Sequence, residues 1–215
     1  MHDIERSLAI DDLLALPPGF RLMPAGAMPA GGDPWTAALR AAARGAEPGC
    51  VFWDRAQDRC RAAFVLAPDR PLQGVGEVLD LGALAVFDAL ASLAPPQVPM
   101  HLIVPDGLAV DGGRVATLQV EKAAAAPGAV PEWAVLGIDI AVNRIIAANC
   151  ITAAPGDQPD QTCLHEEGFG DVTAADVLTH TCRHLLNWLD AWQQDGPASL
   201  ARIAARRTRP DVVAA

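Results

Sequence analysis

Basic residues are scarce in this chain of 215 residues. Lys and Arg together number 16, against 26 Asp and Glu, and the formal net charge at pH 7 is −10. Proteins that bind nucleic acids usually concentrate Lys and Arg, because contacts with phosphates release condensed counterions. The charge balance therefore argues against nucleic acid as a partner.

Long apolar runs are also missing. No stretch approaches the roughly 20 uninterrupted apolar residues of a membrane-spanning helix, and the first residues, MHDIERSLAIDD, contain no apolar segment of signal-peptide length. A hydrophobic fraction of 51% with 20% charged residues fits one soluble domain with a substantial core. We therefore expect a cytoplasmic protein without a membrane partner.

No pair of cysteines has the CxxC spacing of a metal or redox motif. The odd number of cysteines and their wide separation indicate free thiols in a reducing compartment; they are Cys50, Cys60, Cys150, Cys163 and Cys182. His180 and His184 are the one closely spaced pair of zinc-ligand type, and no third ligand is recognisable. We therefore expect no metal site and interpret both histidines as part of the solvated face of a helix.

Apolar periodicity and capping residues predict several helices. Asp33 and Pro34 are a typical helix start, a capping side chain followed by a proline at the first helical position, and Gly45 ends that helix. Thr173 is a candidate cap for the last predicted helix, in which one stripe comprises Leu178, Cys182, Leu185, Leu189 and Trp192. The predicted helices cover residues 8–16, 33–45, 77–93 and 172–194.

The predicted strands lie between these helices. β-branched or alternating segments cover residues 50–54, 61–68, 101–104, 108–120 and 132–142, and AAAA at 123–126 is expected to be a loop. Strands clustered between helices, without strict βαβ alternation, predict an α+β fold. We expect an N-terminal arm over residues 1–32, which wraps the surface, one domain over 33–207, and a tail over 208–215.

Four segments resemble the catalytic domain of biotin protein ligases. Val104-Pro105-Asp106-Gly107 stands where that family has WPND, Arg114-Val115-Ala116-Thr117 stands where it has KxxG, and Glu121 stands at its acid. GIDIAVN, from Gly137 to Asn143, is similar to the family strand GIGINVN. TCLHEEGF and WQQDGPASL are similar to segments near the last family helix, so the resemblance spans about residues 33–207.

The resemblance implies a biotin/lipoate-protein ligase-like fold of the class II aminoacyl-tRNA synthetase type, a mixed and largely antiparallel sheet flanked by helices. It implies ATP, with Mg²⁺, as the activating substrate for biotin or a lipoate-like small carboxylic acid, and the lysine of a biotin/lipoyl carrier domain as acceptor. Arg114, in the place of the family lysine, would hold the acid carboxylate or the α-phosphate.

Six further residues complete the predicted ligand and nucleotide site. Asp106, Gly137, Asp139 and Asn143 come from the matching motifs, whereas Trp53 and Arg55 come from the first strand and the loop after it. Three of the six have a structural alternative. Asp106 fits ordinary turn chemistry, Asn143 could satisfy a strand-end backbone group, and Trp53 is a large hydrophobe before it is a stacking platform.

The chain also departs from the family in ways that bear on catalysis. Only DRAQDRCR lies between Trp53 and Ala62, where the family has a glycine- and arginine-rich loop, and Arg55, Arg59 and Arg61 are its possible remnants. Donors aimed at developing charge are usually the largest catalytic contribution, and Asp139 adds a carboxylate. A non-catalytic descendant that binds a ligand or partner is therefore the alternative, and whether the chain is an enzyme stays open.

Two smaller hypotheses concern the C-terminal part. Cys163 and His165 could form a covalent acyl intermediate if the fold brought thiol and imidazole together. The alternative is an inert thiol. The basic run at the end is interpreted as a solvated helix end, favoured by the helix dipole, and comprises Arg202, Arg206, Arg207 and Arg209.

Overall fold

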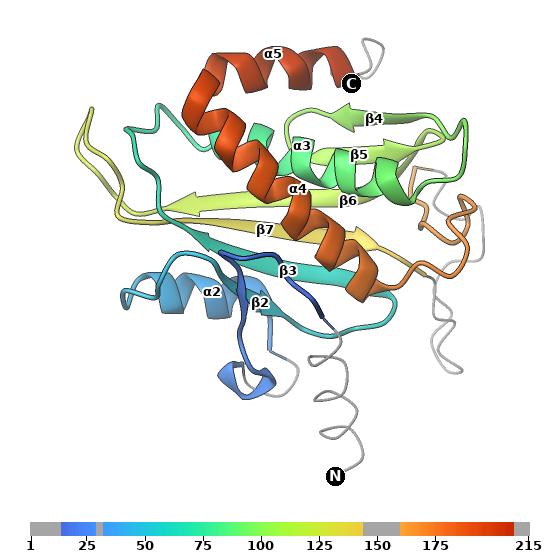
Figure 1. Cartoon of the computed structure of the whole chain (residues 1–215), viewed down its shortest axis with the longest axis horizontal. Coiled ribbons are helices and arrows are strands. Elements are labelled where there is room, and N and C mark those ends of the chain that lie inside the picture. The colour runs from blue at the N-terminus through green and yellow to red at the C-terminus, as the bar shows by residue number, and fades with distance from the viewer. Residues whose placement is uncertain (1–13, 29–31, 144–159, 209–215) are drawn as a thin grey trace.

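The computed structural model describes residues 14–28, 32–143 and 160–208. Seven strands form one sheet in the order β1-β2-β3-β7-β6-β5-β4 (Figure 1). The strands are β1 (Arg21–Leu22), β2 (Cys50–Trp53), β3 (Arg59–Leu66), β4 (Met100–Ile103), β5 (Gly107–Val110), β6 (Gly113–Lys122) and β7 (Ala134–Ala141). Only β1 and β2 run parallel, and the other neighbours pair antiparallel. The predicted mixed, largely antiparallel α+β fold is confirmed.

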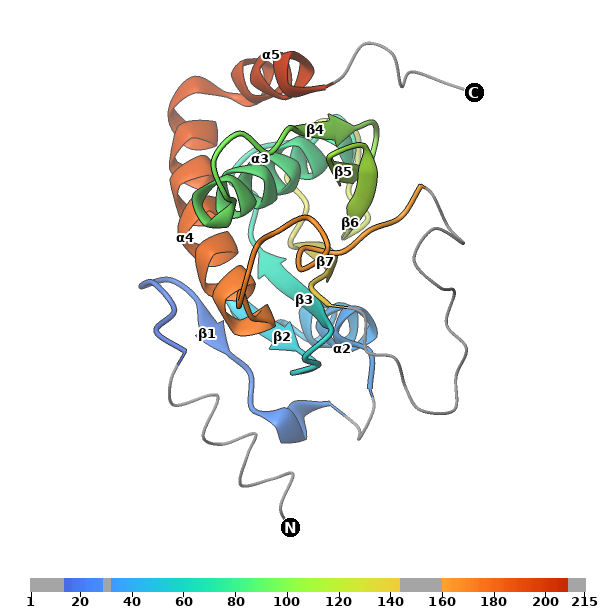
Figure 2. The same cartoon turned by 90° about the vertical axis from the view of Figure 1, so that its right-hand side faces the viewer.

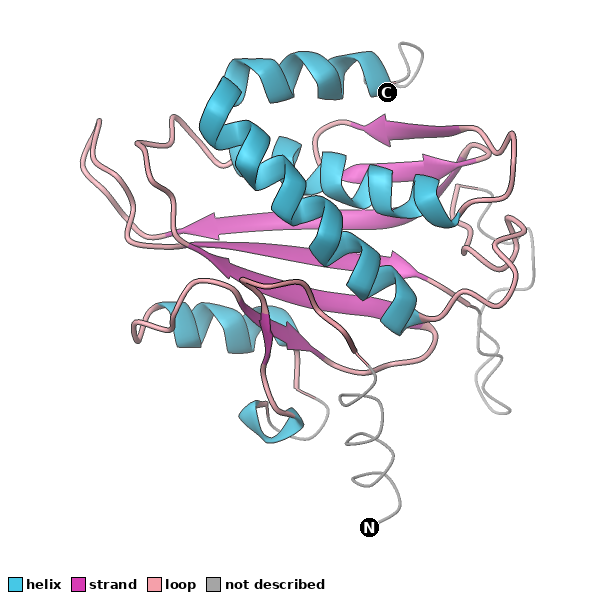
Figure 3. Cartoon of the chain, in the orientation of Figure 1, coloured by secondary structure: helices cyan, strands magenta, loops and turns pink. Residues whose placement is uncertain are grey.

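Three helices cover one face of the sheet (Figure 3). They are α3 (Gly76–Leu93), α4 (Ala174–Asp195) and α5 (Pro197–Arg207). Thr173 caps α4 in a capping box with Asp176, as the sequence predicts. Gly82 lets α3 lie close to the sheet, because a Cβ there would be 2.6 Å from a methyl of Leu136 on β7. The main hydrophobic core lies between this helical layer and the sheet.

The helix α2 (Pro34–Ala42) lies on the opposite face (Figure 2). Asp33 accepts hydrogen bonds from the backbone of Trp35 and Thr36, which confirms the predicted cap. The helix packs on β2, β3 and β7, where Ala38 and Ala42 are buried in a second hydrophobic cluster. Over β4, β5 and β6, no helix of the described part of the chain covers this face (Figure 2). We call this side of the sheet, where α2 covers only β2, β3 and β7, the open face.

The N-terminal arm takes part in the sheet. Arg21 and Leu22 pair with Cys50 and Val51, so the arm adds a short edge strand as it crosses the surface. The predicted helix at 8–16 falls mostly outside the described residues, and its last residues, 14–16, are not helical. Leu14, Leu16 and Phe20 pack against the main core, and the short 3₁₀ helix η1 (Ala25–Ala27) follows. Apolar side chains therefore attach the arm to the domain.

The end of α5 is packed rather than solvated. Arg207 donates to the Asp88 carboxylate at 2.7 Å, and its guanidinium lies over the rings of Phe87 and Trp188. Trp188 donates its indole N–H to the same carboxylate at 2.8 Å. The predicted solvated helix end is therefore wrong for Arg207, because α3 and α4 supply a carboxylate and two aromatic rings that contact its charge and its stem. Arg209 lies outside the described residues.

His180 is also only partly solvated. Its Nδ1 lies 2.7 Å from the hydroxyl of Ser92 on α3, so this face of α4 meets α3. Burial, then the nearby Arg183 and His184, lower the pKa of His180 below its ordinary value. The prediction of a wholly solvated face is wrong at this position, because α3 packs against it.

The described cysteines behave as small buried hydrophobes. Cys50, Cys60, Cys163 and Cys182 are all buried. Burial raises the pKa of the Cys60 thiol well above its usual range and that of Cys182 to about 12, so both stay protonated at neutral pH. Cys150 lies outside the described residues. Among the described helices, none combines the length and the apolar character needed to span a membrane.

Candidate functional site

A row of residues crosses four strands on the open face. Arg61 of β3 pairs with Asp139 of β7, Asp139 pairs with Thr117 of β6, and Thr117 pairs with Gly107 of β5. Directly paired residues on neighbouring strands project to the same side of a sheet. The row is therefore one surface, which we call the polar row.

Arg114 lies over the glycine at one end of the polar row. A bulge between Leu108 and Ala109 shifts the register there, so Arg114 pairs with Ala109. A Cβ on Gly107 would be 2.8 Å from the Arg114 guanidinium carbon, so the glycine leaves the space that this side chain fills. Because Gly107 belongs to the polar row, the Arg114 guanidinium lies on the open face.

The Arg114 guanidinium pairs with Asp106 at 3.4 Å, and their side chains are 34% and 41% exposed. The backbone of Arg114 is hydrogen-bonded to residues 160–162. Its N–H donates to the Asp160 carbonyl, and its carbonyl accepts from the Thr162 N–H. The backbone is therefore fixed on both sides, while the long and partly exposed ion pair leaves the guanidinium free to meet another anion. The structure thus brings together two predicted site residues, Arg114 and Asp106.

Arg61 of the polar row and its neighbour Arg59 are already neutralised. Arg59 donates to Asp139 at 2.7 Å, with side chains 42% and 40% exposed, and Arg61 donates to Asp54 at 2.5 Å. The Asp54 side chain is only 8% exposed. Together with Arg114 and Asp106, the three arginines and three carboxylates sum to no net charge. This part of the face therefore holds little uncompensated positive charge to attract a phosphate.

Gly137 is covered by a helix residue that the sequence analysis did not place in the site. A Cβ on Gly137 would be 2.7 Å from Cε3 of Trp35 and 2.9 Å from Gln119. Trp35, in the first turn of α2, therefore fills the space above this glycine. The predicted nucleotide contact of the Gly137 backbone stays a prediction, and Trp35 would have to leave room for it.

Trp53 and Arg55 are not brought to the open face. Trp53 is 2% exposed and belongs to the main core beneath the helical layer, on the other side of the sheet. Arg55 donates to the carbonyls of Trp53 and Met23 at 2.8 and 3.0 Å, and so ties the arm to β2. Burial and backbone bonding already account for these two side chains, so their role as ligand contacts stays a prediction that this arrangement does not favour.

The connection between β2 and β3 is as short as the sequence predicts, running only over residues 54–58. Its Asp58 carbonyl accepts from the backbone N–H of Asn143 at 3.0 Å, just beyond the end of β7. Asn143 is exposed. Its backbone therefore joins two loops, while the residue is exposed just beyond the end of β7.

The described residues support neither a metal site nor acyl transfer by Cys163. Residues 14–28, 32–143 and 160–208 contain no cluster of three or more His, Cys, Asp or Glu that could hold a metal ion. Cys163 is 1% exposed, and Nε2 of His165 lies 3.0 Å from the carbonyl of Val172. A thiol enclosed in this way offers no accessible nucleophile for acyl transfer.

Sequence reasoning missed Trp35, Thr117 and Gln119 as residues of this face. The alternation Ala116-Thr117-Leu118-Gln119 could have placed the two polar residues opposite the core, because successive strand residues face opposite sides. No comparable signal exists for Trp35. A tryptophan in the first turn of a helix gives no indication of which strand it will cover.

Comparisons with known proteins agree with this fold. Residues 16–204 match the model of the biotin/lipoate A/B protein ligase family. A biotin protein ligase-like protein of unknown function from Silicibacter sp. TM1040 is 28% identical, with a TM-score of 0.77 over 91% of this chain and 81% of that one. Comparison with functionally curated proteins gives no match.

More distant solved structures share the fold. Biotin protein ligase from Aquifex aeolicus, in complex with biotin and ATP, is 16% identical with a TM-score of 0.60, over 80% of this chain and 73% of that one. The enzyme from Leishmania major, in complex with biotinyl-5-AMP, is 12% identical with a TM-score of 0.61, over 93% and 85%. With its seven-stranded sheet and the family match over residues 16–204, the chain belongs to the biotin/lipoate A/B protein ligase family.

Proposed function

We propose that the chain activates a small carboxylic acid with ATP and transfers it to the lysine of a biotin/lipoyl carrier domain. The observation that supports this most directly is the position of Arg114. Its guanidinium lies over Gly107 on the open face, and its ion pair with Asp106 is long and partly exposed. Biotin protein ligases of the same fold bind biotin, ATP and biotinyl-5-AMP.

In this proposal Arg114 binds the acid carboxylate, or the α-phosphate once the adenylate forms. A guanidinium can meet either group with two parallel hydrogen bonds. The carboxylate oxygen attacks the α-phosphorus, the bond to the leaving pyrophosphate breaks, and the acceptor lysine later displaces AMP from the acyl carbon. Mg²⁺ would enter with ATP and offset part of the negative charge of Asp106 and Asp139.

Asn143 has a place in this proposal as a contact for the nucleotide, since it is exposed where β7 ends. Asp139 is a less direct participant, because Arg59 already binds it. Gly137 would contact a ligand only if Trp35 moved away from it. Arg114 and Asn143 are therefore the residues most accessible to a ligand, whereas Asp139 and Gly137 are already in contact with other side chains.

The test is ATP–pyrophosphate exchange by the purified full chain with biotin, lipoate, octanoate or no added acid. Exchange that depends on one of these acids, and that is lost in Arg114→Ala, is the expected result. A folded protein that exchanges pyrophosphate with none of them would overturn the adenylation step. If exchange is observed, labelling of a biotinyl or lipoyl carrier domain, detected by mass spectrometry, tests the transfer step.

A second candidate function is non-catalytic binding of a small acid or a protein partner. The paired arginines favour it, because Arg59 and Arg61 are bound to carboxylates and so contribute little attraction for phosphate. The short β2–β3 connection also favours it, since residues 54–58 are too few to fold over a bound adenylate. Calorimetry distinguishes the two functions. Acid binding that does not require ATP, without any exchange, would favour this candidate.

A further inference from the structure

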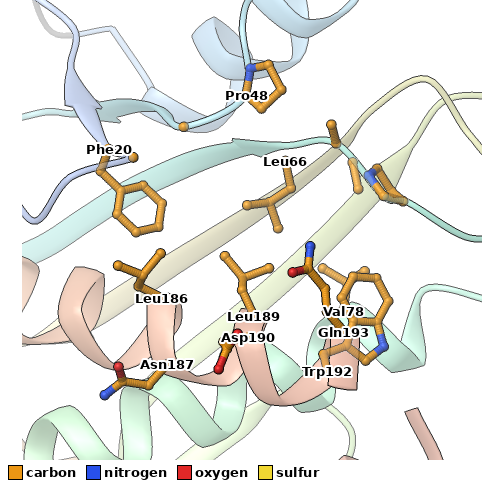
Figure 4. A pocket seen from close by; sticks show the side chains of 15 residues that line it. Phe20, Pro48, Leu66, Val78, Leu186, Asn187, Leu189, Asp190, Trp192 and Gln193 are labelled. Carbon is orange, nitrogen blue, oxygen red and sulfur yellow. The ribbon is translucent and has the colours of Figure 1, made fainter. Parts of the chain in front are cut away.

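An apolar cavity lies on the helical side of the sheet, away from the polar row. Its volume is about 560 Å³, and it opens between α4 and the residues that flank β1, β2 and β3, among them Phe20, Pro48 and Pro68 (Figure 4). Leu66 and Trp192 form a buried floor, at 7% and 4% exposed. In Figure 4, Phe20 and Leu66 face Leu186 and Leu189 across the gap. Since Leu66 belongs to the main core, this cavity is on the opposite face from Arg114.

The polar lining of this cavity comes from one helix. Asn187, Asp190 and Gln193 all lie on α4 and are exposed, so they form the rim. None of the lining residues is Lys, Arg or His. Within the described part of the chain, Asp190 pairs with no basic residue, and its carboxylate accepts a hydrogen bond from the Gln194 amide at 2.7 Å. The rim therefore carries an uncompensated negative charge.

The end of α4 adds to this negative potential. The carboxyl end of a helix has a partial negative charge, which a basic residue in the last turn usually offsets. The last turn of α4 has none. Arg70 offsets part of this partial charge, since it donates to the Gln193 carbonyl at 3.1 Å and its guanidinium lies over the Trp192 ring, but it also pairs with Asp69 at 3.1 Å. The cavity thus joins an apolar floor to a rim that favours a cation.

We propose that this cavity binds a small amphipathic cation, an apolar body with one ammonium group. The apolar body would lie against Leu66 and Trp192, and the ammonium would lie at the rim near Asp190 and the end of α4. The volume falls within the roughly 300–1,000 Å³ of small-molecule sites. Leu186, an exposed large hydrophobe at 38%, would be covered by the bound ligand. An anionic amphiphile would be repelled by the same rim.

Calorimetry of the full chain with octylammonium and 1-octanol, below micelle-forming concentrations, tests the proposal. Both ligands should bind saturably. Octylammonium should bind about fivefold more tightly than 1-octanol, because its ammonium forms one ion pair with Asp190 at a solvent-exposed rim. Asp190→Asn should remove this difference. Asp195→Asn is the matched control, because it removes the same charge from the same helix end without changing the lining. Leu189→Ala should weaken both ligands.

Any of four outcomes would overturn the proposal. The first is the absence of saturable binding by either probe at millimolar concentration. The second is equal affinity for octylammonium and 1-octanol. The third is an equal loss in Asp195→Asn and Asp190→Asn, which would assign the effect to the general field of the helix end. Displacement of octylammonium by biotin or lipoate would also count against it, since the acid-binding face is on the other side of the sheet.

Discussion

Arg59 and Asp139 form a 2.7 Å ion pair between β3 and β7, although 80 positions separate them along the chain. Asp139 stands where the resembling ligase motif has a glycine. In the proposed function, this pair would neutralise an arginine beside the nucleotide. Its removal should change what the open face attracts.

We predict that Asp139→Gly strengthens ATP binding. Without its partner, Arg59 gains an unpaired charge, and we expect the affinity for ATP to rise by about fivefold at low salt. Isothermal titration calorimetry measures this. The free energy of unfolding should change by less than about 1 kcal/mol, because exposed ion pairs contribute little. If Asp139→Asn and Asp139→Gly bind ATP no more tightly than the parent chain, Arg59 does not face the nucleotide.

Gly107→Ala should mimic the loss of Arg114. The new methyl would meet the guanidinium of Arg114, which is the far end of a flexible side chain and can move at little cost. We expect both Gly107→Ala and Arg114→Ala to lower the affinity for the acid substrate by roughly tenfold or more, as for a lost hydrogen bond to a charged group. Calorimetry with the acid identified by exchange checks this. Circular dichroism should show unchanged folding. An unaffected affinity in both variants would remove Arg114 from the site.

The close packing of Trp35 on Gly137 gives a stability prediction. Gly137→Ala should destabilise the fold by about 1–3 kcal/mol, because its Cβ would meet ring carbons of Trp35. In a Trp35→Ala background the same change should cost less than about 1 kcal/mol, which a double-mutant cycle in urea measures. Gly76→Ala is the control, since a Cβ there meets nothing within 4 Å. Equal costs in both backgrounds would show that Trp35 does not cover Gly137 in solution.

His180 should make the stability of the fold depend on pH. Burial, followed by Arg183 and His184, lowers the pKa of His180 in the folded chain below its ordinary value of 6.5. Between these two pKa values the unfolded chain binds more protons, so stability falls as the pH drops below about 6.5. Urea unfolding at pH ~7.5 and ~5.5 should therefore show a smaller drop in His180→Asn than in the parent chain. The same drop in both proteins would assign the pH dependence to other groups.

Local signals account for most of the elements that the sequence predicts. Asp33 with Pro34 placed the start of α2, Thr173 placed the start of α4, and alternation placed the strands, because caps and side-chain periodicity act over a few residues. The motif register also placed Arg114 and Asp106 together.

What could not be predicted depends on partners that are distant along the chain. Trp35 over Gly137 requires α2 to cross β7, and Arg207 against Asp88 requires α5 to fold back on α3. A basic helix end looks the same in sequence whether it is solvated or packed against aromatic rings. For Trp53 the sequence allows two interpretations, a stacking platform or a core hydrophobe, and its position in the main core agrees with the second.

The edges of the sheet limit how another chain could join it. An edge strand with unpaired backbone groups can recruit a further strand, which is a common route to assembly and to aggregation. Here the β1 edge is only two residues long, and Thr208 bridges Leu102 on β4 at the other edge. A carrier domain or a second copy would therefore meet side chains on the faces of the sheet rather than backbone at its margins. Recognition would then depend on side-chain chemistry, which surface substitutions can alter without disturbing the fold.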